Sequence, residues 1–137
     1  MRKRKAFTII ELLIVISIIS ILIAFLAPKL LGAKDRAKEV AVKSIMHSAQ
    51  LAIEAYEMEN ETYPPDNNVP IESLCKNYLM VGGYLASVPQ NPFTGAPYKD
   101  ADSAGKIIYN YDEPSGKYTL TGYNRSGLKQ IQVLSNL

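Results

Sequence analysis

One acidic side chain, Glu11, stands inside a long apolar run, where a charge needs a chemical reason. Two chemistries are open to it. Thr8 lies three residues earlier, and the T-x-x-E spacing predicts a capping box, in which both side chains bond free backbone N–H groups at a helix start. Alternatively, a carboxylate in apolar surroundings pairs with a positive partner, such as an amine. The spacing of Thr8 and Glu11 taken alone favours the cap.

The other residues of catalytic or metal-binding types form no recognised pattern. His47 is the only histidine and Cys75 the only cysteine, and no His/Cys metal spacing, nucleophile elbow or phosphate loop occurs. We expect Cys75 to be a small buried apolar group, and one cysteine allows no intrachain disulfide. Acids that could offer oxygens to calcium are expected to be solvated loop residues: Asp100, Asp102 and Asp112. We therefore expect neither enzymatic activity nor a cofactor.

Glu11 must be positioned by the apolar run Phe7 to Ala27, whose 21 residues match the roughly 20 needed to cross a bilayer. Twelve of the residues from Leu12 to Ala27 are Leu, Ile, Val or Phe, each favouring insertion by about 0.3 to 0.6 kcal/mol. Their sum exceeds the cost of about 3 kcal/mol or less for Glu11. We predict a transmembrane helix over residues 7–28. A secretory signal is the competing interpretation, but its apolar region is only about 7 to 15 residues long.

Four basic residues precede this run: Arg2, Lys3, Arg4 and Lys5. By the positive-inside rule they hold the N-terminus in the cytoplasm, so that the rest of the chain lies outside. The chain's formal charge is +2, and the leader supplies four of its positive charges. That balance does not predict nucleic-acid binding.

The junction of leader and run carries an ordered motif: Ala6, then Phe7, Thr8 and, fifth from Phe7, Glu11. It resembles the prepilin signal of type IV pilins and type II secretion pseudopilins, with Ala6 in place of the commoner Gly. The resemblance implies that a prepilin peptidase removes residues 1–6 by cutting between Ala6 and Phe7, and that Phe7 is N-methylated. It also reverses the preference at Glu11, because the new amine of Phe7 in a neighbouring subunit could pair with Glu11 during filament assembly.

Beyond the membrane segment, Pro28 predicts a helix kink, with Gly32 as a second soft point. Residues 29–61 are predicted to continue as an amphipathic helix, since no proline follows until Pro64. The face expected to turn towards the rest of the chain is marked by small and apolar residues three and four apart: Ala37, Val40, Ala41, Ser44, Ile45, Ser48, Ala49, Ala52 and Tyr56.

Residues 62–137 are predicted to form a globular head. Residues 70–81 are typical of a short helix or turn with Leu74, Tyr78 and Leu79 inward, and residues 82–105, with four glycines and three prolines, of an irregular loop. Three strands of an antiparallel meander follow, at 106–111, 117–123 and 129–134. The predicted fold class is α+β: a long N-terminal helix, transmembrane and then amphipathic, packed on a small three-stranded antiparallel sheet.

The head resembles that of the major, G-type pseudopilin more than that of large adhesive pilins. The residues that carry this resemblance are Thr62-Tyr63-Pro64, Gly83-Tyr84-Leu85, Val88-Pro89, Asn91-Pro92-Phe93, Gly95 and Pro97-Tyr98. Many major pseudopilins bind calcium through an aspartate-containing loop near the C-terminus. The comparable turn here has Arg125 where an acid would be needed, so no calcium site is predicted.

Three functions are consistent with these features. The first is a structural subunit of a periplasmic or extracellular helical filament, the pseudopilus of a type II secretion system. Its partners would be further copies of itself, the prepilin peptidase, an inner-membrane assembly platform with its ATPase, and the lipid bilayer. The second is a major or minor pilin of a type IV pilus, serving adhesion, motility or DNA uptake. The third is a single-pass anchor carrying an extracytoplasmic binding domain.

Overall fold

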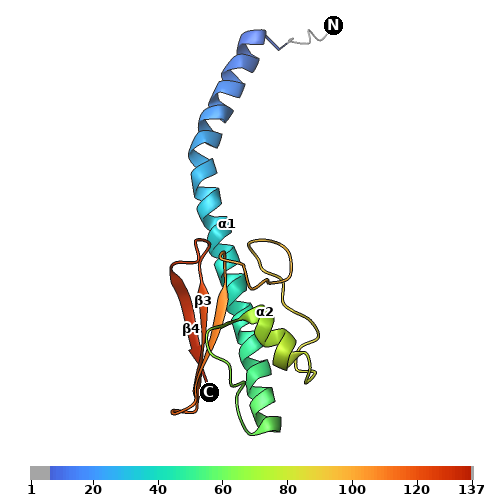
Figure 1. The fold of residues 1–137 in the computed structure, drawn as a ribbon. Coiled ribbons are helices and arrows are strands. Elements are labelled where there is room, and N and C mark those ends of the chain that lie inside the picture. Colours follow the sequence, from blue (N-terminus) through green and yellow to red (C-terminus); the bar gives the residue numbers. More distant parts are fainter. Residues whose placement is uncertain (1–6, 137) are drawn as a thin grey trace. The chain divides into compact units, whose positions relative to one another are not determined.

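The computed structural model describes residues 7–136, which form two compact units that divide between Asp35 and Arg36. The leader residues Arg2, Lys3, Arg4, Lys5 and Ala6 lie outside the described residues. Helix α1, Ile9–Asn60, begins in the first unit and ends in the second. Each unit has its own character, the first apolar and exposed, the second a folded α+β head (Figure 1).

The first unit is the beginning of α1, and every described residue in it up to Lys34 is exposed. By length and composition, α1 contains the one stretch among the described residues that could cross a membrane. The helix continues through Pro28 without a break. A bend at Pro28 and a soft point at Gly32 therefore remain predictions.

In the second unit, α1 buries a stripe of large apolar residues that differs from the predicted one. Val42, Met46 and Ile53 have no exposed surface. Four residues of the predicted inward face are exposed: Ala37, Val40, Ser44 and Ser48. The prediction followed small residues, but the stripe spaced at four, seven and eleven residues from Val42 removes more apolar area from water. Of the predicted face, Ala49 and Ala52 are buried.

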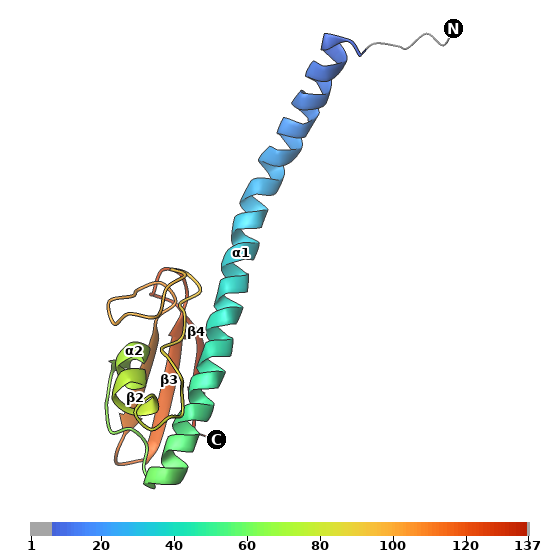
Figure 2. The same cartoon turned by 90° about the vertical axis from the view of Figure 1, so that its right-hand side faces the viewer.

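The second unit contains an antiparallel sheet in the order β1-β2-β3-β4, beside which α1 runs (Figure 2). Its strands are β1 Val69–Pro70, β2 Ile107–Asp112, β3 Lys117–Tyr123 and β4 Gln130–Ser135. The last three agree with the predicted strands to within one residue at each end. The expected count of three is wrong because Val69 and Pro70 pair with Tyr109 and Ile108. Strand β1 has only two residues, which is too short to show an alternating pattern in the sequence. Its proline is compatible with a sheet because β1 lies at the sheet edge.

The core lies between α1 and the sheet and contains large tyrosines whose hydroxyls are bonded. Tyr109 and Tyr118 are fully buried and stack with ring centroids 5.6 Å apart. The hydroxyl of Tyr109 donates to the Pro64 carbonyl at 2.9 Å. On β3, a Cβ at Gly122 would lie 2.4 Å from the Met46 sulfur, so the absence of a side chain there lets strand and helix approach closely.

A short helical segment follows β1 as α2, Ile71–Leu74, and η1, Cys75–Leu79, which has π-helical geometry. Leu74, Cys75 and Leu79 are fully buried, which confirms the inward positions predicted for the two leucines and the buried cysteine. Burial raises the pKa of the Cys75 thiol to about 12. The thiol is therefore neutral and unreactive in the folded head.

Residues 82–105 form the predicted irregular loop, which is ordered around the buried Asn91. Its Nδ2 donates to Asp102 at 3.0 Å and to the Ala104 carbonyl at 2.9 Å, while its Oδ1 accepts from the Phe93 N–H. Lys38 of α1 holds the loop from outside, with Nζ 3.4 Å from the Phe93 carbonyl oxygen and 5.4 Å from its ring centroid.

Candidate functional site at the start of helix α1

The start of α1 contains the predicted capping box. The N–H and the hydroxyl of Thr8 both donate to Glu11 Oε2, at 2.9 and 2.7 Å, and the Glu11 N–H donates to the Thr8 hydroxyl at 3.3 Å. Two backbone donors at the helix start are thus satisfied reciprocally. The cap is confirmed within the single chain, and pairing of Glu11 with a neighbour stays a prediction.

The cap uses one of the two carboxylate oxygens of Glu11. Within residues 7–136, no hydrogen bond or ion pair to Oε1 is found, and the side chain lies on an exposed helix end. An ionised carboxylate can accept several hydrogen bonds. The geometry therefore leaves Glu11 able to accept a second, charged donor while its own cap remains intact.

The helix surface around Glu11 is built to meet an apolar environment. Phe7 is 75% exposed, and the apolar side chains that follow it are exposed on all sides of the helix. The two serines in this stretch bond their own helix: Ser17 donates to the Leu13 carbonyl and Ser20 to the Ile16 carbonyl, both at 2.7 Å. Glu11 is thus the only charged side chain from Phe7 to Pro28, and lipid or other helices must cover the rest.

The outward face of α1 in the second unit carries exposed apolar residues, one of which, Val40, was predicted to face inward. Val40, Leu51 and Met58 are 64%, 66% and 81% exposed. Their spacings of eleven and seven residues place them on one line of the helix. The sequence contains that spacing, but small residues three and four apart indicate a different face. The exposed apolar line is a surface at which a second helix could pack.

Two of the three acids considered for calcium, Asp100 and Asp102, have structural partners, and the third, Asp112, is the exposed last residue of β2. Asp102 Oδ2 accepts from Asn91 and from the Lys99 N–H, each at 3.0 Å, and Asp100 accepts from the N–H and hydroxyl of Ser73. At the C-terminal turn, the Asn124 side-chain oxygen accepts from Ser126 and from the Lys129 N–H. Over residues 7–136, no group of three or more His, Cys, Asp or Glu residues has the geometry to hold a metal ion.

His47 lies on the exposed side of α1, where its Nε2 is 3.3 Å from the side-chain nitrogen of Gln132 on β4. A general base needs a partner group and an enclosed site for substrate. Among residues 7–136, the contact given for His47 is with the amide of Gln132, which is neither an acidic partner nor part of an enclosed site. It packs at the junction of helix and sheet.

Comparisons with known proteins agree with the site. A family model of the prokaryotic N-terminal methylation motif matches residues 1–27. Core protein G of the type II secretion system from Vibrio cholerae serotype O1 is 30% identical over 100 residues, covering 68% of each chain. Its counterpart from Aeromonas hydrophila is 30% identical over 105 residues, covering 72% of this chain and 73% of the relative. This chain belongs to the core protein G family.

Members of the core protein G family are structural subunits. One further relative belongs to a pilus: PilA4, the type IV wide pilus major component of Thermus thermophilus, is 48% identical over 63 residues, covering 46% of this chain and 48% of the relative. No solved structure matches the chain significantly. The resemblance to type IV pilins and type II pseudopilins predicted from Ala6, Phe7, Thr8 and Glu11 is thus confirmed.

Proposed function

We propose that this chain is a structural subunit of the pseudopilus, the helical filament of a type II secretion system. The observation that carries the proposal is the start of α1, where an exposed apolar helix holds a single carboxylate. One of its oxygens is in a cap, and the other has no hydrogen-bond partner among residues 7–136. Such a helix end suits assembly from a membrane into a filament core, because neighbouring helices replace lipid and supply a partner for the charge.

In the proposed pathway the chain has four functional segments. Residues 1–6 are the cleaved leader, 7–28 the membrane and assembly helix, 29–61 the amphipathic half of the helix, and 62–137 the head. The leader lies in the cytoplasm and the head outside the inner membrane, by the positive-inside argument. A prepilin peptidase, an assembly platform and an ATPase are the proposed partners of this pathway.

Cleavage between Ala6 and Phe7 gives Glu11 its proposed partner. The amine freed on Phe7 is positive and lies one helical turn from Glu11 in sequence. Because an unpaired charge is costly in an apolar core, a subunit is stabilised only when the amine and carboxylate of neighbours meet in register. The open Oε1 of Glu11 supports this role.

The first test removes the carboxylate. In cells carrying the assembly machinery, Glu11→Ala should leave membrane insertion unchanged and lower the sheared filament yield about tenfold or more, the factor given by about 1.4 kcal/mol of lost pairing. Glu39→Ala, which removes an acid further along α1, is the matched control and should assemble normally. Unchanged filament yield in Glu11→Ala would contradict the proposal.

A type IV pilus is the second candidate, favoured by the identity of 48% shared with PilA4 over 63 residues. The core protein G relatives cover a larger share of this chain and favour the pseudopilus. These matches favour a filament protein over an anchored binding domain. Deleting the gene separates the two filaments: loss of protein secretion indicates the pseudopilus, and loss of surface motility with normal secretion indicates the pilus.

A further inference from the structure

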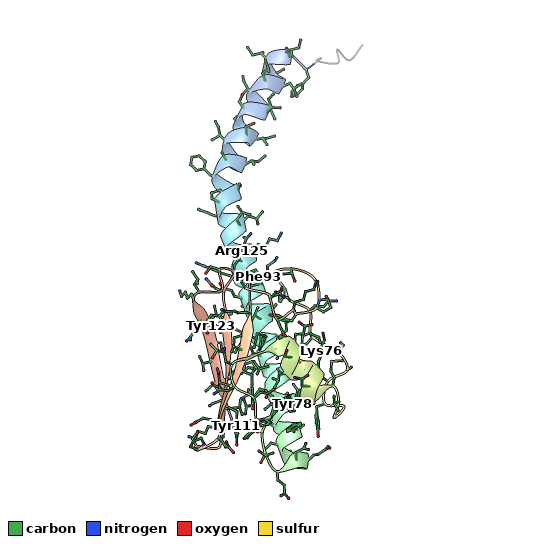
Figure 3. All side chains as sticks on the ribbon, viewed as in Figure 1. Lys76, Tyr78, Phe93, Tyr111, Tyr123 and Arg125 are labelled. Atoms are coloured by element: carbon green, nitrogen blue, oxygen red, sulfur yellow. The ribbon has the colours of Figure 1, made fainter. Side chains whose placement is uncertain are left out.

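A hollow of about 230 Å³ lies at the C-terminal end of α1 in the second unit. Three tyrosines line it, Tyr56 of α1, Tyr78 of η1 and Tyr84, together with Asn60, Asn77 and the turn at residues 81–82. Tyr56 makes edge-to-face contacts with the other two rings, at centroid distances of 5.8 Å and interplanar angles of 88° and 72°. Figure 3 shows Tyr78 where the yellow-green helix meets the green end of α1.

The rings of this hollow are held in place by contacts of their own. The Tyr84 hydroxyl donates to Glu59 at 2.6 Å and accepts from Asn60 at 3.3 Å. Its ring lies against Gly82, where a Cβ would be only 2.1 Å away. Burial and a hydrogen bond to Asp66 raise the pKa of Tyr78. The hollow is therefore a preformed aromatic site.

The charge around the hollow is negative. None of its lining residues is basic, and the sequence from Ser44 to Cys75 holds six Asp or Glu residues and no Lys or Arg. Of these acids, Glu59 accepts from the Tyr84 hydroxyl, and Asp66 contributes to the raised pKa of Tyr78. The C-terminal end of α1 adds the negative end of the helix dipole.

Rings set at large angles to one another around a small space, in a negative field, are the arrangement that binds ammonium groups through cation–π attraction. We propose that this tyrosine hollow binds a lysine side chain presented by another protein chain. The methylene stem of the lysine would lie on the tyrosine rings and Val81, while the side-chain oxygens of the asparagines accept from its ammonium group.

The same chemistry argues against a choline lipid headgroup as the occupant. A phosphocholine carries a phosphate beside its ammonium group, and the hollow offers no basic side chain to receive it. Glu59, whose carboxylate accepts from the Tyr84 hydroxyl, would repel the phosphate. A lysine side chain carries the positive charge without a phosphate, so this repulsion does not arise.

The test uses the full chain in maltoside micelles, a detergent without a cationic headgroup, with its tyrosine rings labelled for NMR. Nα-acetyl-lysine methylamide should shift the ring signals of Tyr56, Tyr78 and Tyr84 saturably. It should bind about three- to thirtyfold tighter than the norleucine analogue, which has the stem without the charge, as expected from cation–π energies. Phosphocholine should bind more weakly than the lysine analogue.

Two variants test whether the preference for lysine over norleucine arises at the tyrosine hollow. Tyr84→Leu removes one wall and should abolish the lysine preference, and Gly82→Ala should do the same by displacing the Tyr84 ring. Tyr123→Leu, on β3 and outside the hollow, is the matched control and should bind like the unchanged chain. The proposal would be overturned if the lysine and norleucine analogues bound equally, or if phosphocholine bound more tightly than the lysine analogue. It would also be overturned if binding saturated without shifts of these three rings. Because the test uses unassembled chain, its outcome does not depend on the proposed pseudopilus.

Discussion

At the scale of single residues, the observed cap of Glu11 and its proposed pairing between subunits are compatible. The capping box with Thr8 was one alternative for this carboxylate, and the structure contains it. The cap occupies one oxygen only, so the self-contained cap and the proposed charge pair between subunits do not compete for the same atom. The cap also orders the helix end, which fixes the direction in which the carboxylate can meet a neighbour.

Thr8 should therefore matter for the helix end rather than for insertion. Thr8→Ala removes the hydroxyl that bonds Glu11 in both directions and should destabilise the first turn of α1 by about 1 kcal/mol. In micelles, hydrogen exchange at the amides of the first turn should become about fivefold faster. Ser17→Ala, whose hydroxyl bonds only a carbonyl within the helix, should leave those rates unchanged. Equal exchange rates in Thr8→Ala and the parent would show that the cap contributes nothing.

At the scale of elements, α1 is tied to the sheet by a second carboxylate. Glu54 accepts from the Tyr118 hydroxyl at 2.7 Å through Oε1 and from the Tyr63 hydroxyl at 2.9 Å through Oε2. The rings of Tyr63 and Tyr118 are in contact, with centroids 4.8 Å apart. One side chain thus joins helix, strand β3 and the segment after the helix.

Replacing this carboxylate should destabilise the head. Glu54→Ala leaves the two hydroxyls without their acceptor and should lower the free energy of unfolding by about 1 to 3 kcal/mol. Glu54→Gln keeps one acceptor oxygen, so its free energy of unfolding should fall by less than that of Glu54→Ala. Denaturant unfolding followed by tyrosine circular dichroism measures both, with Glu57→Ala as the control expected within about 0.5 kcal/mol of the parent. A Glu54→Ala head as stable as the parent would contradict this account of the junction.

The tyrosine core also predicts how the head responds to alkali. Burial, then the hydrogen bond to Glu54, raises the pKa of Tyr63 to about 12, and burial raises the pKa of Tyr98, Tyr109 and Tyr118. Unfolded tyrosine ionises near pH 10, so folding favours the neutral phenol. This stability is fully present below pH about 10 and is lost as the pH rises through about 12.

A titration followed at 295 nm checks this linkage. Part of the tyrosine absorbance should rise near pH 10, and the remainder only as the head unfolds at higher pH. Far-ultraviolet circular dichroism recorded in parallel reports unfolding. Ionisation of all nine tyrosines near pH 10 in a head that stays folded would contradict the burial of the ring cluster.

At the scale of the whole molecule, the features with long or repeated patterns were predictable from the sequence. The apolar run, the uninterrupted helix and the three longer strands each extend over enough residues to show their period. The capping box was predictable because its spacing is local. The α+β class followed from the order of these elements.

The features set by contacts between distant residues were not predictable. The two-residue strand β1 is defined by its pairing with β2, and the inward face of α1 depends on where β3 approaches at Gly122. The tyrosine hollow joins Tyr56 with Tyr78 and Tyr84, which are more than twenty residues away in sequence. No local pattern in a single sequence predicts such long-range contacts.

We propose above all that this chain is cut between Ala6 and Phe7 and is built into a filament through the helix that follows Phe7. Mass spectrometry of the N-terminus of the subunit in filaments sheared from cells tests it most directly. We predict a subunit that begins at N-methylated Phe7 and that is found in the sheared fraction. Sheared filaments whose subunits retain Met1, or a chain that begins at Phe7 but stays wholly in the membrane fraction, would contradict the account.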